Sequence, residues 1–169
     1  MQNPVLRLIE PEDVDAYRNL YRQALRESAD SFEATLEDAD AKGSESYALE
    51  LRQRYGFGCF QGRDLIGMVF FRPSSGGKAS HRAALSNFYV DFRYRRQRIA
   101  YALLELAKEI SKLKKIQQLE LLVSSAADRA IEFYTKAGFQ QTGCIPNAIK
   151  TDGDRHDLLL MVLEIESTG

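Results

Sequence analysis

An amphipathic helix pattern between two apolar strand patterns constrains the fold of this chain more than any other feature. From Ile99 to Leu113, apolar residues recur in steps of four and three, which gives one apolar stripe along an α-helix. This pattern lies between Ala83–Val90 and Leu119–Val123, both of which are typical of β-strands. A strand–helix–strand crossover is right-handed and joins parallel strands of one sheet. The middle of the chain therefore predicts a parallel strand pair with a helix on one face.

The N-terminal half predicts antiparallel structure. Gly62 supplies a permissive backbone in the four-residue turn of an expected hairpin. Proline and acids at positions 11–13 are typical of the first turn of a helix. The expected elements are a strand at 5–9, a helix from 11 to about 25, a second helix within 48–54, the hairpin strands 57–60 and 65–71, and a loop at 73–78. The acidic segment 28–45 carries no clear pattern.

The C-terminal part continues the alternation of helix and strand. We expect a short helix over 127–137, closed by Gly138 just after its last turn, and closing strands at 139–144 and 158–165. Hairpins and a crossover together predict an α/β fold with a mixed, twisted sheet and helices on both faces. A chain of 169 residues is long enough for one domain, which we expect to span residues 1–169.

Charge and composition argue against several classes of function. The net charge is −1, so no global field attracts nucleic acid or a membrane surface. No apolar run approaches the roughly 20 residues that span a bilayer, and the start of the chain lacks the pattern of a signal peptide. We therefore expect a cytoplasmic protein without nucleic-acid or membrane partners. Cys59 and Cys144 form no C-x-x-C pair, and we expect both to be small buried residues.

The segment between the central strand and its helix carries the strongest functional signal. Arginines at positions 93, 95, 96 and 98 surround the start of the helix. The first N–H groups of a helix have no internal partner and its dipole is positive there, so this end suits an anion such as a phosphorylated ligand. A solvated basic turn is the simpler alternative. A nucleic-acid patch is a third, but the neutral net charge weakens it.

Two motifs resemble those of the GNAT superfamily of acetyl-CoA-dependent N-acetyltransferases. The stretch Arg95 to Ala100 resembles the acyl-CoA motif Q/R-x-x-G-x-G/A, with Arg98 in place of the middle glycine. The stretch Ala127 to Phe139 resembles N-x-x-A-x-x-x-Y-x-K-x-G-F, with Ala127 in place of the asparagine. Phe92 stands two residues after Val90, at a position where the family commonly has a proline. The likeness covers essentially the whole chain and implies a mostly antiparallel sheet whose middle parallel strands splay apart to admit the cofactor.

The resemblance also implies a site and a reaction. Acetyl-CoA is the expected donor and an amine, on a small molecule or a protein, is the expected acceptor; a homodimer is a further expectation for such a protein. Tyr134 is the expected acid that protonates the departing sulfur, and a backbone N–H of Phe88–Val90 is the expected donor to the carbonyl oxygen. The expected cofactor-binding residues are Phe88, Tyr89, Val90, Arg95, Arg96, Gln97, Arg98, Ile99, Ala100, Ala127, Ala130, Phe133 and Tyr134.

Several alternatives stay open at this level. Tyr134 is also compatible with a core tyrosine capped by one hydrogen bond, although the motif favours the acid. Arg98 either turns outward and grips a phosphate or fills the site and blocks it, and in the second case the chain is a degenerate GNAT domain that binds CoA or a protein partner without catalysis. Glu33 and Glu120 are candidate bases, although each is also compatible with an ordinary surface acid. We assign no role to His81 or His156, and no cluster has metal-ligand spacing.

Overall fold

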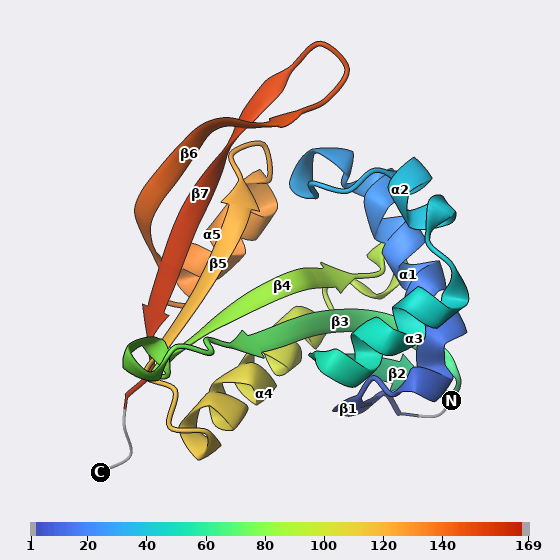
Figure 1. Cartoon of the computed structure of the whole chain (residues 1–169), viewed down its shortest axis with the longest axis horizontal. Helices are drawn as coiled ribbons and strands as arrows, with labels where there is room; N and C mark the ends of the chain where they lie inside the picture. Colours follow the sequence, from blue (N-terminus) through green and yellow to red (C-terminus); the bar gives the residue numbers. More distant parts are fainter. Residues whose placement is uncertain (1–2, 167–169) are drawn as a thin grey trace.

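The computed structural model describes residues 3–166 and has one seven-stranded sheet (Figure 1). Residues 1–2 and 167–169 of the expected domain lie outside the described residues. The strand order is β1-β2-β3-β4-β5-β7-β6, and β4–β5 is the parallel pair among antiparallel ones. The strands are β1 (Val5–Leu8), β2 (Tyr55–Gln61), β3 (Asp64–Pro73), β4 (Arg82–Val90), β5 (Gln118–Ser124), β6 (Gln140–Lys150) and β7 (Arg155–Glu164). The predicted mixed, mostly antiparallel sheet is confirmed.

Helices cover both faces of the sheet, as expected (Figure 1). One face carries α1 (Val14–Glu27), α2 (Leu36–Ala41) and α3 (Ser44–Gln53), and the other carries α4 (Ile99–Leu113) and α5 (Asp128–Lys136). Each face buries its own apolar cluster. Tyr17 and Leu20 of α1 belong to the cluster of Phe70 of β3, whereas Leu103 and Leu104 of α4 belong to the cluster of Leu119 of β5. Short 3₁₀ turns, η1 (Pro11–Asp13), η2 (Ala29–Ser31), η3 (Gly77–Ala79) and η4 (Phe92–Tyr94), link these elements.

The two middle strands pair only at one end. Arg82–Ala84 of β4 lie opposite Gln118–Glu120 of β5, and no further pairing joins the two strands although both continue. The predicted splay of the parallel pair is therefore present. Because the remaining edge of β4 has no strand partner on this side, its backbone groups are available to a ligand.

A bulge shapes β4 where the strands separate. Met68 pairs with Tyr89 and Phe70 pairs with Ser86, so one residue of β3 opposes both Asn87 and Phe88. Asn87 takes a left-handed backbone with φ +48°, and its side-chain amide donates a hydrogen bond to the Tyr17 hydroxyl at 3.2 Å. Bulges re-aim side chains and end regular pairing, and this one lies beside the gap between β4 and β5.

The structure assigns elements to the segment that carries no clear sequence pattern, and it contradicts the prediction for one cysteine. The acidic segment 28–45 contains η2 and α2, and α2 begins at a capping box in which Thr35 and Asp38 bond each other's backbone. The prediction that both cysteines are buried is wrong for Cys144, which is exposed, whereas Cys59 is buried. Cys144 lies on β6, the last strand of the sheet, where no further strand covers it.

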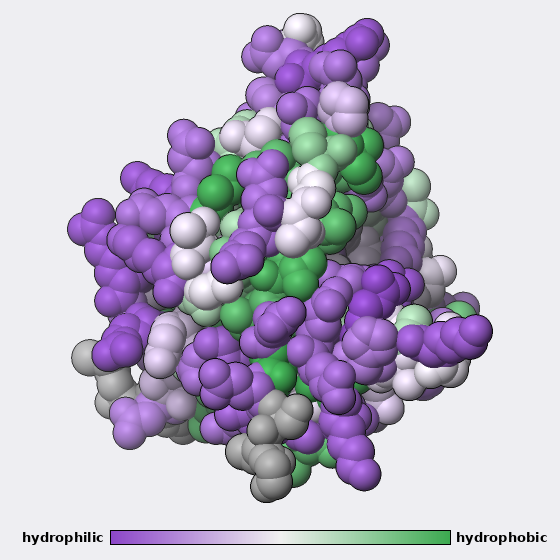
Figure 2. Space-filling view, turned by 90° about the vertical axis from the view of Figure 1, so that its left-hand side faces the viewer, coloured by the Kyte–Doolittle hydropathy of each residue, from purple (hydrophilic) through white to green (hydrophobic). Residues whose placement is uncertain are grey.

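The closing strands also run further than their apolar residues suggest. β6 continues to Lys150 and β7 begins at Arg155, so polar residues extend the hairpin beyond the sheet (Figure 1). The pairing is interrupted between Ile145 and Ile149, where Asn147 adopts φ +52°. The face of the molecule on the β6 side shows a band of apolar surface between polar side chains (Figure 2), and Ile145 of β6 is 50% exposed.

Candidate functional site

A cleft of about 1320 Å³ runs along the gap between β4 and β5. One end opens at the start of α4 and α5, and the other end is lined by the segment that follows α1. Residues from every central element meet here because the two strands stop pairing after Ala84 and Glu120. The end of pairing between β4 and β5 thus leaves a gap in the sheet, and the cleft lies in this gap.

The loop that leads into α4 forms a concave anion site. Arg96 and Arg98 both have left-handed backbones, with φ +63° and +62°, whereas Gln97 between them does not. Such alternation turns successive N–H groups toward one side, which makes a small anion-binding concavity. Arg98 is also the N-cap of α4 and makes no side-chain capping bond, so the first N–H groups of the helix stay open. A negatively charged group is therefore stabilised at this end.

Three exposed arginines give this end of the cleft its positive charge. Arg96, Arg98 and Arg129 line the cleft, and none of them forms an ion pair within residues 3–166. The Arg98 guanidinium lies 4.9 Å from the ring centroid of Tyr101, which is itself 47% exposed. Arg98 therefore lines the cleft and stacks on an exposed ring of α4.

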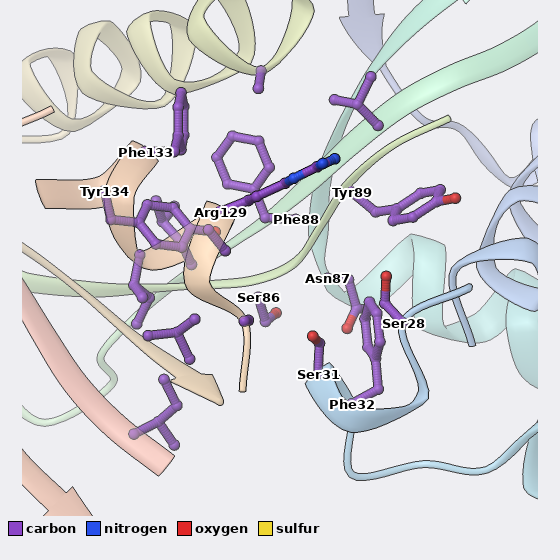
Figure 3. A pocket seen from close by; sticks show the side chains of 18 of the residues that line it. Ser28, Ser31, Phe32, Ser86, Asn87, Phe88, Tyr89, Arg129, Phe133 and Tyr134 are labelled. Atoms are coloured by element: carbon purple, nitrogen blue, oxygen red, sulfur yellow. The ribbon is translucent and has the colours of Figure 1, made fainter. Parts of the chain in front are cut away.

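The wall beside this end is apolar and comes from α5. Ala127, Ala130 and Phe133 line the cleft opposite Phe88 of β4, and the Phe88 and Phe133 rings meet edge to face at 5.9 Å. The alanines leave room beside the aromatic rings, and Figure 3 shows Arg129 reaching across the pocket past Phe88. An apolar arm that ends in phosphate would match this wall and the arginines next to it.

Tyr134 lies in the same wall with an unused hydroxyl. The ring is only 7% exposed and packs against Phe88, Phe133 and Phe139 at 5.4–5.9 Å between ring centroids. The tyrosine hydroxyls that form hydrogen bonds within the described part of the chain are those of Tyr17, Tyr47 and Tyr89, so the Tyr134 hydroxyl is unused there, and the residue lines the cleft. Burial raises the pKa of the phenol, so it stays protonated at neutral pH. A capped core tyrosine would use its hydroxyl.

The opposite end of the cleft has a different character. Ser28, Ser31 and Phe32 come from the segment after α1 and face Ser86 and Asn87 of β4 (Figure 3). Leucines of β5 and β7 extend this end as an apolar floor: Leu122, Leu158 and Leu160. The bulge at Asn87 separates this end from the aromatic wall, so the cleft offers two different binding surfaces on either side of one strand irregularity.

Carboxylates line this second end. The candidate bases Glu33 and Glu120 both lie there, and Glu120 is 3.5 Å from the Arg82 guanidinium. Glu27, which the sequence did not single out, contacts the Tyr89 hydroxyl. Burial, together with the bond to Glu27, raises the pKa of Tyr89. His81 is exposed, and His156 lies 3.8 Å from Asp30 outside the cleft lining.

The structure brings the expected cofactor residues together with one exception. Phe88, Tyr89, Val90, Arg95, Arg96, Arg98, Ile99, Ala100, Ala127, Ala130, Phe133 and Tyr134 all line the cleft. Gln97 is exposed in the loop and does not line it. The sequence reasoning missed Arg129, although its place in the first turn of the predicted α5 was a usable signal, and it missed Ser28 and Phe32, which only the fold brings across the sheet.

Residues 3–166 contain neither a cluster of metal-ligating side chains nor a membrane-spanning helix. No group of three or more histidine, cysteine, aspartate and glutamate side chains gathers there as metal ligands would. None of the helices over the same residues combines the length and the apolar character needed to cross a membrane.

Comparison with known proteins gives one family and one fold. The model of the acetyltransferase (GNAT) family matches residues 14–139, which is most of the chain. A comparison with curated protein sequences gave no significant match. Among solved structures, a GNAT-family acetyltransferase from Streptococcus pneumoniae is 22% identical, with a TM-score of 0.80 over 97% of this chain and 100% of that one.

Two further structures are similar over nearly the whole chain. The ribosomal-protein-S18-alanine N-acetyltransferase from Escherichia coli is 20% identical, with a TM-score of 0.76 over 99% of this chain and 97% of its own. The yncA protein from Salmonella typhimurium, solved with its cofactor acetyl-CoA, is 18% identical, with a TM-score of 0.79 over 99% and 97%. At these identities the likenesses show the fold. Together with the family match, they establish that the chain belongs to the acetyltransferase (GNAT) family.

Proposed function

We propose that this protein is an N-acetyltransferase that moves an acetyl group from acetyl-CoA to a primary amine of a small molecule or a protein. One observation carries the proposal: a single cleft joins an open, cationic helix start to a buried phenol that forms no hydrogen bond within residues 3–166. Anion binding and proton donation are the two abilities that acetyl transfer from a phosphorylated thioester requires. The family generally uses acetyl-CoA, and a compared structure contains it.

The cofactor lies, in this proposal, with its phosphates at the loop from Arg95 to Ala100. Backbone N–H groups of the loop and the guanidinium groups of Arg96, Arg98 and Arg129 bind the phosphates. The pantetheine arm then follows the free edge of Phe88–Val90 and the small-residue face of α5. These residues fit the group chemically, since charge is gathered where the phosphates lie and apolar surface where the arm lies.

Transfer proceeds by direct attack in a ternary complex. The amine nitrogen bonds to the carbonyl carbon as the carbon–sulfur bond breaks, the Tyr134 hydroxyl gives its proton to the departing thiolate, and the nitrogen loses a proton. The raised pKa of Tyr134 keeps that proton in place until the thiolate forms. A backbone N–H at the free edge of β4 near Phe88 stabilises the charge on the carbonyl oxygen.

The acceptor approaches from the end lined by Ser28, Ser31 and Phe32. This end lies across the Asn87 bulge from Tyr134, so the amine and the leaving sulfur are on opposite sides of the carbonyl (Figure 3). Glu33, Glu120 or a chain of water molecules accepts the proton that the amine loses.

The alternative is a degenerate domain that binds CoA or a protein partner without catalysis. The replacement of the motif glycine by Arg98 motivates it. Arg98 adopts the left-handed backbone that glycine favours and stacks on Tyr101, and both observations favour an open cofactor site over a blocked one.

Two measurements test the proposal in sequence. Acetyl-CoA at 100 times its Kd stabilises a protein that binds it by about 2.7 kcal/mol, so the unfolding midpoint should rise clearly. A panel of amines should then release CoA thiol, detected with a thiol reagent, with polyamines, amino acids and short peptides as acceptors. No rise in midpoint would contradict the acetyl-CoA site, and a rise without thiol release from any amine would favour the degenerate domain.

A further inference from the structure

Glu27, the last residue of α1, connects the two ends of the cleft. Its carboxylate accepts hydrogen bonds from the Tyr89 hydroxyl and, at 3.2 Å, from the Gln23 side-chain amide. It also lies 3.7 Å from the guanidinium of Arg95, the first residue of the acyl-CoA motif. Three side chains from α1, β4 and the loop before α4 therefore converge on one carboxylate.

Arg95 differs from the other arginines of this end. Its Nε donates a hydrogen bond to the Val90 carbonyl at 3.2 Å, and its guanidinium lies 5.6 Å from the Tyr89 ring centroid. Its charge is offset by Glu27, whereas Arg96 and Arg98 form no ion pair within residues 3–166. The Arg95 side chain is therefore directed at protein groups, and its neighbours are left for an anion.

The residues that follow Glu27 form the acceptor end of the cleft. Ser28, Ser31 and Phe32 line it. Two backbone bonds hold the segment locally, from the Ser28 N–H to the Ala24 carbonyl at 2.9 Å and from the Ser31 N–H to the Ser28 carbonyl at 2.8 Å, and the Phe32 ring packs edge to face on Tyr21 of α1. Glu27 stands where this segment leaves α1. The contacts that hold Glu27 in place therefore also hold the start of segment 28–32, which we call the acceptor wall.

We infer that Arg95 and Glu27 form a tie between the cofactor loop and the acceptor wall, and that the Arg95 side chain does not bind a cofactor phosphate. Both are positioning residues: they act through segment 28–32, which touches the acceptor. The inference rests on the proposed function for its role in the reaction, while the tie itself is a property of the protein alone. It assigns the first arginine of the motif a different task from that of Arg96 and Arg98.

Measurements of acetyl-CoA binding distinguish the positioning task of Arg95 from the phosphate-binding task of Arg96 and Arg98. Arg95→Met and Glu27→Gln should each change the Kd of acetyl-CoA, measured by calorimetry, by less than about twofold. Arg98→Met, the matched control, removes a charge that has no carboxylate partner within residues 3–166 and should weaken binding about tenfold, as expected for a lost hydrogen bond to a charged group. The inference would be overturned if Arg95→Met weakened acetyl-CoA binding as much as Arg98→Met does, and if Glu27→Gln, which releases the arginine, made acetyl-CoA bind more tightly.

Hydrogen exchange tests the tie without any ligand. Amides of segment 28–32 should exchange several-fold faster in Arg95→Met and in Glu27→Gln, and the double variant should add nothing, because both changes break one connection. Arg95→Lys keeps the opposite charges together and should restore part of the protection. Unchanged exchange in both single variants would overturn the inference even if the protein binds no acetyl-CoA, so failure of the tie and failure of the proposed function remain distinct.

Steady-state kinetics adds a readout that a general loss of stability would not give. With the amine that the thiol-release panel selects, both variants should raise the KM for the amine severalfold and leave the KM for acetyl-CoA unchanged. Equal changes in the two KM values would count against a role confined to the acceptor wall.

Discussion

At the scale of single residues, three positions in and near the site have an unusual environment or an unusual backbone conformation. Tyr134 is buried among three phenylalanine rings that can offer no hydrogen bond, so its hydroxyl is left to the cleft. Arg98 holds a backbone conformation that costs an L-residue about 1–2 kcal/mol. Asp91 is 1% exposed and keeps its charge through Arg93. Each arrangement predicts a measurable effect.

Replacing Tyr134 by phenylalanine should slow CoA release by about 10²-fold or more, the lower end of general acid catalysis. The hydroxyl forms no hydrogen bond within residues 3–166, where the bonded tyrosine hydroxyls are those of Tyr17, Tyr47 and Tyr89, so the free energy of unfolding should change little. Tyr55→Phe, on an exposed ring of β2 outside the cleft, is the matched control. A variant with undiminished turnover would show that another group, or water, protonates the sulfur.

Replacing Arg98 by glycine should raise the free energy of unfolding by about 1 kcal/mol, because glycine adopts φ +62° without strain. Acetyl-CoA should bind about tenfold more weakly, since one cationic donor is lost. Urea unfolding and calorimetry measure the two effects. Gln97→Gly, one residue earlier at an ordinary φ, should instead destabilise the protein; equal effects at both positions would contradict the backbone argument.

The stability of the protein should fall as the pH drops below about 4. Burial alone would raise the pKa of Asp91, but the side-chain and backbone bonds from Arg93 hold it below its usual value. A lowered folded-state pKa contributes stability above the unfolded pKa, and this is lost as the pH falls through the folded one. Asp91→Asn should flatten this part of a stability profile from pH 7 to 3, whereas Asp152→Asn, in an exposed turn, should not.

At the scale of elements, close contact between α4 and the sheet sets the position of the anion site. Gly67 of β3 lies under the first turn of the helix, where a Cβ would come within 2.8 Å of Ile99 and 3.2 Å of Leu103. The lack of a side chain lets the helix start lie close to the end of β4. The N–H groups of the helix thereby reach the mouth of the cleft, so a packing detail on β3 supports the cofactor site.

Replacing Gly67 by alanine should destabilise the protein by about 1–3 kcal/mol through overpacking against Ile99 and Leu103. The displaced helix start should also weaken acetyl-CoA binding. Gly77→Ala is the control, because a Cβ there meets nothing within 4 Å. Denaturant unfolding of both variants checks the prediction, and similar midpoints would mean that the helix shifts without cost.

At the scale of the whole molecule, the sheet consists of two parts joined by a short parallel pairing. Three residue pairs connect β4 to β5, and antiparallel ladders hold β1–β4 on one side and β5–β7 on the other. The apolar cluster beneath α4 and α5 crosses this junction, since Leu85, Leu103 and Leu121 all belong to it. The shared core, more than the hydrogen bonds between β4 and β5, therefore holds the two parts together.

The protein should consequently unfold in one cooperative transition, as expected for a single domain. Far-UV circular dichroism and the fluorescence of its eight tyrosines, with no tryptophan present, should give coincident denaturation curves. Leu85→Ala, which removes a side chain from the shared core, should lower the midpoint of both curves together. Two separated transitions would show that the parts on either side of the cleft fold independently.

Much of the fold was predictable because it depends on local periodicity. The stripe from Ile99 to Leu113 and its two flanking strands predicted the parallel pair, and the turn at Gly62 predicted the β2–β3 hairpin. The two motifs contain most of the residues that line the cofactor end of the cleft, because each motif follows a strand, β4 or β5, that borders the same gap. The extent of β6 and the exposure of Cys144 were not predictable, because they depend on which strand lies at the edge of the sheet.

The sequence by itself determined the order of the elements and the charge at the start of α4, because both are properties of neighbouring residues. Only the tertiary structure decided that Ser28 and Phe32 face Asn87 across the cleft and that Glu27 meets Arg95. These contacts join residues more than 50 positions apart. Local preference carries no information about such pairs, since the register of the sheet and the packing of α1 bring them together.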